Sequence, residues 1–386
     1  MLIKPRAGQA ARIKVVGIGG GGGNAISSMI FEGGIPGVEF IAVNTDAQAL
    51  LHNKAEVKIQ IGDNLTRGLG SGGDPEVGRQ AAEESREKLK EELSGADMIF
   101  ITCGMGGGTG TGASPIIAEV AKETGALTIC VVTKPFEFEG AKRKVAANEG
   151  SQRLKEKVDT MIIVPNQKIL QIIDKNTSIL EAFKKIDSVL HQGVKGIAEL
   201  ITLPGLINVD FADVRTVMNN AGTALMGIGS GTGEKRALSA IKQAISSPLL
   251  DVSIDGARGV LFNVVGGPDL TMAEIDEAAT IIAKTADPDA DIIFGAVIDE
   301  KMHDEVRITL IATRFDDRKL KLFNFQKDPM RDESVTPPSA DSTKPVSRLK
   351  EELEAKEKED IELGDEDAID KEYDFDIPAF LRRKIK

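Results

Sequence analysis

The sequence predicts an α/β protein with a parallel-sheet domain, a long central helix, a smaller second α/β domain and a disordered C-terminal tail. Short apolar runs alternate with helical stretches along the first 165 residues, which is the pattern of a parallel sheet with crossover helices. The 386 residues exceed one ordinary core. Aromatic residues make up only 4% of the chain, so the core must consist mainly of aliphatic side chains.

Six apolar runs rich in β-branched residues are the expected strands of the first domain, which we place at residues 1–176. They are Ile13–Ile18, Val38–Val43, Val57–Ile61, Met98–Cys103, Leu127–Thr133 and Met161–Val164. One helix is expected to begin near Ala25. Asp74 followed by Pro75, and Ser114 followed by Pro115, predict two further helix starts, each with an N-cap and a first-turn proline.

A long helix is expected from Ser178 to about Leu203, within a central segment at residues 177–205. Ser178 and Glu181 form a capping box at its start, and Pro204 ends it. Its apolar residues recur at helical spacing, so one side is expected to be buried. At 1.5 Å per residue the helix would span roughly 40 Å and could brace two domains.

The second domain is expected at residues 206–316. Its predicted strands and helices are Thr223–Ile228, Val260–Val265, Ile292–Ile298, Val306–Thr313, Glu234–Ser246 and Met272–Ala286. Beyond it, residues 346–376 hold fourteen acids against five bases, so residues 317–371 are expected to be a disordered linker. Residues 372–386 are again apolar and also basic, which predicts a peptide that binds a partner.

Charge and cysteine content limit the class of protein. A net charge of -12 argues against general binding to nucleic acid or to an anionic membrane. Cys103 and Cys130 lie in apolar runs, which favours buried, reduced thiols and a cytosolic location. No run reaches 18 apolar residues, so neither a signal peptide nor a membrane-spanning helix is expected.

The first predicted strand leads into a run of glycines at residues 17–23. Glycines there allow backbone N–H groups and a helix N-terminus to approach an anion such as phosphate. Gly17, Gly19 and Gly22 also satisfy the G-x-G-x-x-G pattern, and Asp46 closes the next strand. An NAD-dependent oxidoreductase therefore stays an alternative, as does a simple tight turn.

A second glycine loop follows the fourth predicted strand, whereas a dinucleotide fold needs only one. Residues 106–112, Gly-Gly-Gly-Thr-Gly-Thr-Gly, resemble the signature of the tubulin and FtsZ GTPases, in which this loop wraps the nucleotide phosphates. No Gly-Lys dipeptide occurs in the chain, so the lysine of a Walker A loop is missing. The resemblance implies GTP and GDP as ligands, with Mg²⁺ and backbone dipoles meeting the phosphate charge and no side-chain metal ligand assigned.

A third glycine-rich stretch, residues 68–75, is similar to the FtsZ loop that senses the terminal phosphate. Ser71 and Asp74 stand where the family usually has Ala and Asn. Ser71 adds a possible hydrogen-bond donor, and Asp74 is expected to cap its own helix. The phosphate-binding residues implied by the resemblance are Gly20, Gly21, Gly22, Gly23, Asn24, Gly70, Ser71, Gly72, Gly104, Gly106, Gly107, Gly108, Thr109, Gly110 and Thr111.

The resemblance also implies contacts to the base and sugar from Glu139, Arg143, Asn166, Phe183 and Asp187. The alternative for Glu139 and Arg143 is an i,i+4 ion pair, and the alternative for Phe183 is an ordinary core position. Asp187 lies one turn beyond Phe183, so the ring and the carboxylate share a helix face. A stacked ring beside an acceptor of two N–H groups favours guanine.

The catalytic candidates are Asn208, Asp210 and Asp213, just beyond Pro204. The spacing of the two acids alone would favour a reciprocal N-cap of a helix beginning near Phe211. The resemblance instead implies that they orient the attacking water. Because the long helix separates this turn from the nucleotide of its own chain, the acids could reach only the phosphate of a neighbouring subunit, which implies head-to-tail polymers.

The C-terminal peptide is similar to the one with which FtsZ proteins dock on membrane-tethering division proteins. Its expected contact residues are Ile377, Pro378, Phe380, Leu381, Arg382 and Arg383. The resemblance thus implies a cytoplasmic GTPase at the bacterial division site, partnered by itself and by tethering and regulatory division proteins, without nucleic acid or membrane insertion. A tubulin-like filament for DNA segregation is the alternative within the same fold.

Overall fold

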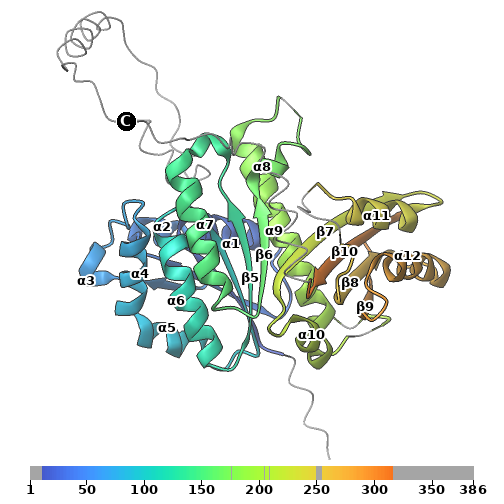
Figure 1. The fold of residues 1–386 in the computed structure, drawn as a ribbon, viewed down its shortest axis with the longest axis horizontal. Coiled ribbons are helices and arrows are strands. Elements are labelled where there is room, and N and C mark those ends of the chain that lie inside the picture. Colours follow the sequence, from blue (N-terminus) through green and yellow to red (C-terminus); the bar gives the residue numbers. More distant parts are fainter. Residues whose placement is uncertain (1–10, 175, 204, 208, 249–253, 316–386) are drawn as a thin grey trace, which may run out of the picture.

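The computed structural model of the protein describes residues 11–174, 176–203, 205–207, 209–248 and 254–315 (Figure 1). The predicted linker, the C-terminal peptide and Asn208 lie outside the described residues. In the part that is described, no helix is both long and apolar enough to cross a membrane.

A single sheet of ten strands runs through the molecule in the order β3-β2-β1-β4-β5-β6-β7-β10-β8-β9. The strands are β1 Ile13–Ile18, β2 Val38–Asn44, β3 Val57–Gln60, β4 Met98–Gly104, β5 Leu127–Lys134, β6 Thr160–Pro165, β7 Gly222–Thr232, β8 Gly259–Gly266, β9 Asp291–Ile298 and β10 Glu305–Thr313. The first six pair only in parallel, as predicted.

The second half of the chain extends this sheet instead of forming a separate one. β7 pairs in parallel with β6 between residues 222–224 and 160–162. β10 is antiparallel to both β7 and β8, and β9 is parallel to β8. The predicted strands of the second region are therefore confirmed, but their continuity with the first sheet was not foreseen.

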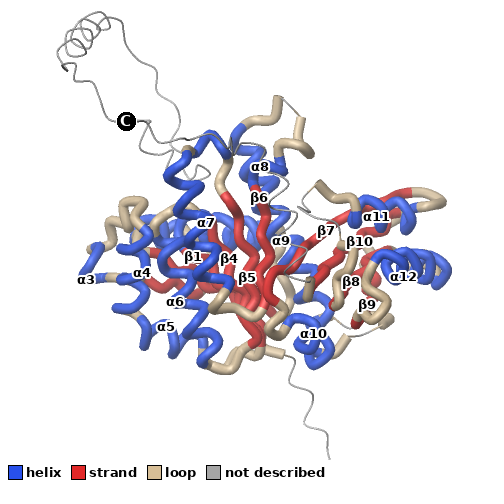
Figure 2. Tube along the Cα trace, viewed as in Figure 1, coloured by secondary structure: helices blue, strands red, loops and turns tan. Residues whose placement is uncertain are grey.

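Helices cover both faces of the sheet (Figure 2). They are α1 Gly19–Phe31, α2 Ala47–His52, α3 Asp63–Thr66, α4 Pro75–Glu84, α5 Arg86–Leu93, α6 Thr109–Glu123, α7 Ala141–Lys155, α8 Asn166–Ile169, α9 Ile179–Thr202, α10 Phe211–Met218, α11 Arg236–Ile245 and α12 Met272–Thr285, with a short 3₁₀ helix, η1, at Glu137–Glu139. α4 to α7 bury their apolar sides in one core, and α1, α9 and α10 in the opposite one. α11 and α12 pack with β8 and β10 in a third.

The capping box of α9 is confirmed. The Glu181 N–H donates to Ser178 Oγ at 3.2 Å, and the Ser178 N–H donates to Glu181 Oε2 at 3.0 Å. The apolar side of α9 is buried as expected, except that Ile179 in the first turn is 54% exposed. α9 contacts α1 and β5 on one side and β8, β9 and β10 on the other, so it does join the two halves of the sheet (Figure 1).

Two predicted helix starts are wrong. α1 begins at Gly19, not near Ala25, so it contains the glycine run; α6 begins at Thr109, and Pro115 lies inside it. Both segments have poor helix propensity, so it is packing against the rest of the protein that determines where these two helices begin. A Cβ at Gly112 would lie 1.8 Å from the Pro75 carbonyl oxygen, which shows how closely α6 packs on α4.

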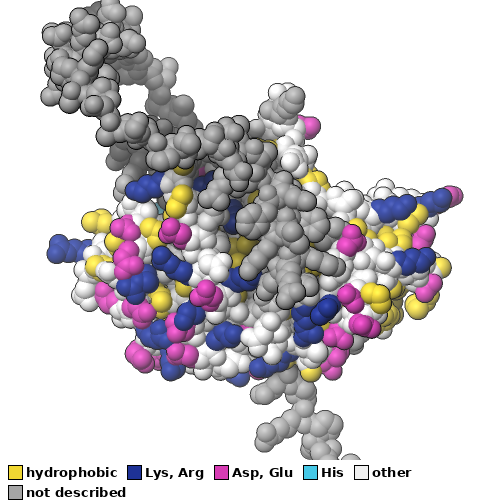
Figure 3. All heavy atoms as spheres, in the orientation of Figure 1, with side chains coloured by type: hydrophobic (Ala, Val, Ile, Leu, Met, Phe, Trp, Pro, Cys, Tyr) yellow, Lys and Arg dark blue, Asp and Glu magenta, His cyan; other side chains and the backbone are white. Residues whose placement is uncertain are grey.

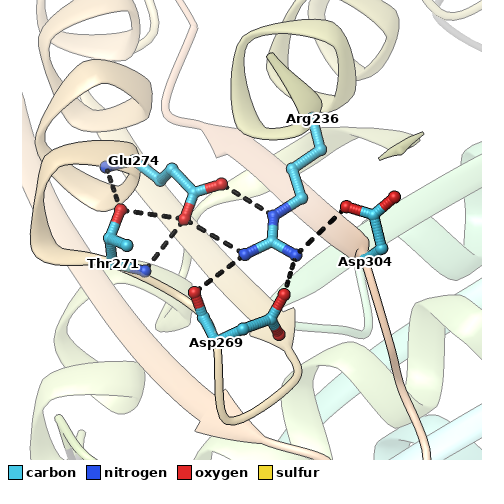
Figure 4. Close-up of polar contacts among 5 residues, drawn as sticks. All are labelled: Arg236, Asp269, Thr271, Glu274 and Asp304. Atoms are coloured by element: carbon cyan, nitrogen blue, oxygen red, sulfur yellow. Dashed lines mark hydrogen bonds and ion pairs between the residues drawn. The ribbon is translucent and has the colours of Figure 1, made fainter. Parts of the chain in front are cut away.

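One buried arginine ties the second half together (Figure 4). The Arg236 side chain, 6% exposed, donates through Nε to Glu274 at 2.7 Å and also pairs with Asp269, while Asp304 Oδ1 lies 3.8 Å away. These residues come from the start of α11, from α12 with its preceding turn, and from the turn before β10. On the outer surface, acidic and basic side chains are interspersed over α4 to α7 (Figure 3).

Candidate functional site

The first two glycine-rich segments lie against each other at the carboxyl ends of β1 and β4, which are neighbours in the sheet. A Cβ at Gly19 would lie 2.9 Å from the Gly110 nitrogen, and one at Gly21 would lie 3.2 Å from the Gly104 nitrogen. Gly19 also has a φ of +70°. Glycine is required at residue 19 and favoured at residue 21, because the two backbones lie in close contact there.

α1 and α6 both begin at this edge without a side-chain cap. Neither Ile18 nor Gly108, their N-cap residues, accepts a hydrogen bond through a side chain. The first N–H groups of a helix have no partner within it, and the helix dipole adds partial positive charge there. Two uncapped helix N-termini at one edge of the sheet form a suitable site for phosphate groups.

The structure brings the predicted residues of both loops together here. Some of the glycines are packed against other elements, and others face open space. Gly20 to Asn24 form the first turns of α1. A Cβ at Gly22 would lie 2.3 Å from the Thr102 carbonyl oxygen, so packing on β4 accounts for this glycine. At Gly107, by contrast, no atom lies within 4 Å of an added Cβ, so this position faces open space.

The Thr111 side chain fixes the shape of the second loop. Its hydroxyl accepts a hydrogen bond from the Gly106 N–H at 2.8 Å, and Thr111 itself is buried. Gly106 has a φ of +96°, which only glycine adopts readily, and a Cβ there would lie 2.9 Å from the Arg143 carbonyl oxygen. Thr111 and Gly106 therefore shape the loop and bring it against α7.

The third glycine-rich segment, residues 68–74, closes over the start of α6. The Ser71 hydroxyl lies 3.1 Å from the hydroxyl of Thr109, which lies 2.7 Å from that of Thr45. A Cβ at Gly108 would lie 2.2 Å from Ser71 Oγ, so the two segments touch directly. The Gly70 N–H donates to the Thr45 carbonyl oxygen at 3.2 Å.

Asp74 behaves as predicted. Its Oδ1 accepts a hydrogen bond from the Glu76 N–H at 2.8 Å and caps α4, so the carboxylate faces its own backbone. The neighbouring Gly72 has a φ of +63°, with no atom within 4 Å of an added Cβ. The open side of this loop is therefore glycine backbone, and the Asp74 carboxylate is occupied by its helix.

Sequence reasoning missed Thr45. It is fully buried, its hydroxyl contacts Thr109, and its carbonyl oxygen accepts from Gly70 and from the Thr66 hydroxyl at 3.3 Å. The available signal was its place at the carboxyl end of β2, beside β1, where parallel sheets hold ligands. Asp46, which suggested an NAD ribose contact, instead caps α2 by accepting from the Ala49 N–H at 3.0 Å.

The predicted base and sugar residues gather around β6, η1 and the first turns of α9. Arg143 donates to Glu139 at 2.8 Å, so the alternative of an i,i+4 pair is realised, and Glu139 Oε1 also accepts from the Phe136 N–H at 2.9 Å. Phe183 is half-buried and meets the Phe136 ring edge-on, with centroids 5.6 Å apart. Phe183 thus packs against the core and is only partly exposed.

Asn166 is the strongest single indication of a ligand among these residues. It begins α8 at the carboxyl end of β6 and is 5% exposed, yet its Oδ1 atom has no hydrogen-bond partner within the described residues. Buried polar atoms in native proteins are almost always hydrogen-bonded, so an unmatched one needs an explanation. A bound molecule that donates a hydrogen bond would supply it. Asp187 is half-buried, one turn beyond Phe183 on α9.

The acidic turn lies at the other end of α9. Asp210 Oδ1 accepts a hydrogen bond from the Asp213 N–H at 2.8 Å and caps α10, so the predicted N-cap is present in one direction. Both acids are exposed, and they line an open cavity of about 420 Å³ together with Leu200, Ile201, Thr202, Leu203 and Val209. Figure 1 shows α8 at the top of the molecule and α10 at the bottom.

Comparison with known proteins agrees with this geometry. Residues 12–174 match the GTPase domain of the tubulin/FtsZ family, and residues 222–316 match the C-terminal domain of the FtsZ family. An empty FtsZ dimer from M. jannaschii is 51% identical, with 80% of this chain and 89% of that chain covered and a TM-score of 0.76. A mutant of FtsZ from the same organism is also 51% identical, with 80% and 92% covered and a TM-score of 0.77.

More distant structures share the fold alone. A GTPγS-bound protofilament of CetZ2 from Haloferax volcanii is 20% identical, with 82% of this chain and 98% of that chain covered and a TM-score of 0.68. The match to a GTPase domain excludes the NAD-dependent oxidoreductase that the first glycine loop had left open. With both domains matched and half of the aligned residues identical to an FtsZ, the chain is a GTPase that belongs to the FtsZ family.

Proposed function

We propose that this GTPase polymerises head to tail into filaments of the cell-division ring, and that it hydrolyses GTP at the interface between two subunits. The glycine-rich edge of one subunit binds the nucleotide, and Asp210 and Asp213 of the next subunit, together with Asn208, complete the active site. The observation that carries this proposal is the position of the two exposed acids at the end of α9 that lies away from the glycine loops.

The length of α9 supports a shared site. Its 24 residues span about 36 Å, and the predicted nucleotide contacts Phe183 and Asp187 lie in its first turns. Carboxylates beyond its last turn cannot reach a phosphate bound at the other end. A surface that binds the opposite surface of an identical copy generates an open filament when the rotation does not close a ring. Among the similar structures, the CetZ2 structure is a protofilament and one FtsZ structure is a dimer.

The turn is suited to orienting water. Asp210 is held by its hydrogen bond to the Asp213 N–H, and Asp213 lies in the exposed first turn of α10. Water placed by these carboxylates would attack the terminal phosphorus, the bond to the bridging oxygen would break, and GDP and phosphate would leave. Loop N–H groups would stabilise the developing charge. An exposed Asp is a weak base, so positioning matters more than proton abstraction.

Mg²⁺ would enter with the nucleotide. Within the described ranges, no three His, Cys, Asp or Glu side chains are grouped to hold a metal ion. In nucleotide sites Mg²⁺ is usually held by phosphate oxygens, several waters and one or two carboxylates. The ion would neutralise phosphate charge that the loop N–H groups do not meet.

Guanine recognition would use Asn166, Phe183 and Asp187. The unmatched Asn166 Oδ1 needs a donor, and the Asp187 carboxylate accepts the paired N–H groups that guanine presents. Glu139 and Arg143, which pair with each other in this structure, would separate and contact the sugar and phosphates. In this proposal the open face of Gly107 lies beside the phosphates, as do Gly70, Gly72, Gly104 and Gly108.

The C-terminal peptide is proposed to bind membrane-tethering division proteins. The match of residues 222–316 to the FtsZ C-terminal domain favours cell division over DNA segregation. Deleting residues 374–386 should leave GTP turnover unchanged and abolish co-sedimentation with vesicles that carry a tether protein. Equal pelleting of the full-length and truncated chains would contradict the partner assignment.

Concentration dependence tests the shared site. We expect GTP turnover per subunit to rise steeply above a threshold protein concentration and to track light scattering by filaments. A turnover per subunit that is constant across that range would indicate a complete active site within one chain.

A further inference from the structure

We propose that Ser71 is a specificity-determining residue of the GTP site, acting as the outer end of a chain of three hydroxyls that begins at Thr45 and passes through Thr109. The inference rests on the proposed function, in which Gly70 and Gly72, on either side of Ser71, lie beside the nucleotide phosphates. It concerns a feature of this chain, because the family it resembles usually has alanine at this position.

The three hydroxyls lie in series from the core to the surface. Thr45 is fully buried, Thr109 is 7% exposed and Ser71 is half-buried. The Thr45 and Thr109 oxygens are 2.7 Å apart, and the Thr109 and Ser71 oxygens are 3.1 Å apart. Each hydroxyl carries one hydrogen. Two hydrogen bonds use two of the three hydrogens, so one hydrogen is left to donate elsewhere; the directions of the two bonds decide whether it is on Thr45, Thr109 or Ser71.

An anion near Ser71 would set the direction of the chain. When Thr45 donates to Thr109 and Thr109 donates to Ser71, the remaining hydrogen is on the Ser71 oxygen. Aligned hydrogen bonds polarise one another, so a negative charge at the outer end strengthens all of them. Thr45 would thus strengthen a contact that it does not itself make.

The surroundings place the outer end of the chain at the phosphate-binding edge. Ser71 Oγ lies against Gly108, the uncapped N-cap residue of α6, where N–H groups already favour an anion. Gly72 and Gly73 follow with φ values of +63° and +84° and no atom within 4 Å of an added Cβ. A terminal phosphate at this edge would therefore have room and could accept from Ser71.

GTP carries this phosphate and GDP does not, so removing the Ser71 hydroxyl should change selectivity. Titration calorimetry on full-length protein, at concentrations below assembly, would measure the affinities for GTPγS and GDP. We expect Ser71→Ala to weaken GTPγS binding about tenfold, because a hydrogen bond to a charged group is lost. GDP affinity should change less than about twofold. Ser71→Thr, which keeps a hydroxyl, should retain most of the GTPγS affinity.

Two further variants separate this role from a structural one. Ser94→Ala removes an exposed hydroxyl at the end of α5 and should change neither affinity. Thr45→Val keeps the shape of the side chain but removes the inner hydroxyl, so the cost of Ser71→Ala should shrink in its presence.

The possible results are distinguishable. A selective loss of GTPγS affinity that shrinks in the Thr45→Val background supports the inference. Equal losses for GTPγS and GDP, or no loss, would overturn it while leaving the proposed function intact. A wild-type chain that binds neither nucleotide would overturn both.

Discussion

The Oδ1 atom of Asp210 accepts a hydrogen bond from the Asp213 N–H at 2.8 Å, so the two acids of the proposed catalytic turn differ in their structural duties. Asp210 caps α10, whereas the Asp213 side chain is exposed in the first helical turn. Substitutions at the two positions should therefore have different effects on stability.

Asp213→Ala should bind GTP normally and lower turnover by about a hundredfold, the range found when a positioned catalytic group is removed. Nucleotide-binding and single-turnover assays on assembled protein would measure both quantities. A loss of GTP affinity in the monomer, with normal hydrolysis of what is bound, would place Asp213 in the nucleotide site of its own chain.

Asp210→Asn should separate the two roles of Asp210, which are to cap α10 and to supply a negative charge for catalysis. Asn caps helices about as well as Asp, so the free energy of unfolding should change little, whereas Asp210→Ala should lower it by about 1 kcal/mol. Both variants should lose turnover, because both lack the carboxylate. Full activity in Asp210→Asn would show that capping is the only role of this residue.

Arg236→Met should destabilise the protein without changing GTP affinity. The substitution leaves Glu274, whose side chain is 17% exposed, without its charged partner, and we expect unfolding to become easier by about 2 kcal/mol. Arg258→Met is the matched control, because Arg258 is 65% exposed and lies 3.9 Å from Asp287. Urea unfolding would show equal effects of the two substitutions if the network in Figure 4 contributed nothing.

The same network predicts an acid dependence of stability. Hydrogen bonds from Arg236 lower the pKa of Asp269 and of Glu274 in the folded protein. A carboxyl whose pKa is lowered by folding stabilises the fold above its unfolded pKa, and this contribution is lost as the pH falls through the folded pKa. The unfolding free energy should therefore fall below about pH 4 more steeply in wild type than in Arg236→Met. Parallel pH profiles would contradict this.

The two cysteines should be inert in the folded protein. Both are buried and unpaired, and burial raises the pKa of the Cys103 thiol to about 12. Only the thiolate reacts rapidly with disulfide reagents. We expect almost no reaction with an aromatic disulfide at pH 8 until urea unfolds the chain. Rapid labelling of the native protein would show that this part of the core opens.

Local signals predicted much of the fold because they act within a few residues. The Ser178–Glu181 capping box and the Asp74 cap are formed by neighbours in sequence, and the apolar runs identified all ten strands. The start of α1 could not be read in this way. Glycine is a poor helix former, and α1 begins at Gly19 because packing against the second loop imposes it.

The candidate site was predicted less completely for a similar reason. The glycine loops were visible in the sequence, but Thr45 is a single threonine directly after β2, and no local pattern marks it. Its importance depends on contacts with Thr109 and Gly70, which lie 64 and 25 residues away in the chain. The pairing of β6 with β7 likewise joins residues 62 positions apart, such as Thr160 and Gly222, which no local pattern specifies.

Complementation between two inactive chains tests the shared active site most directly. Gly107→Glu places a carboxylate in the open space beside the proposed phosphate site, so this chain should not bind GTP but should keep its acidic turn. Asp213→Ala should bind GTP but lack a functional turn. In the mixture, the nucleotide site of an Asp213→Ala chain can meet the acidic turn of a Gly107→Glu chain. Only this kind of interface has both an intact nucleotide site and an intact turn. We predict that GTP turnover of the mixture exceeds the sum of the two separate activities severalfold; a turnover equal to that sum, with both chains present in the filaments, would contradict hydrolysis at the subunit interface.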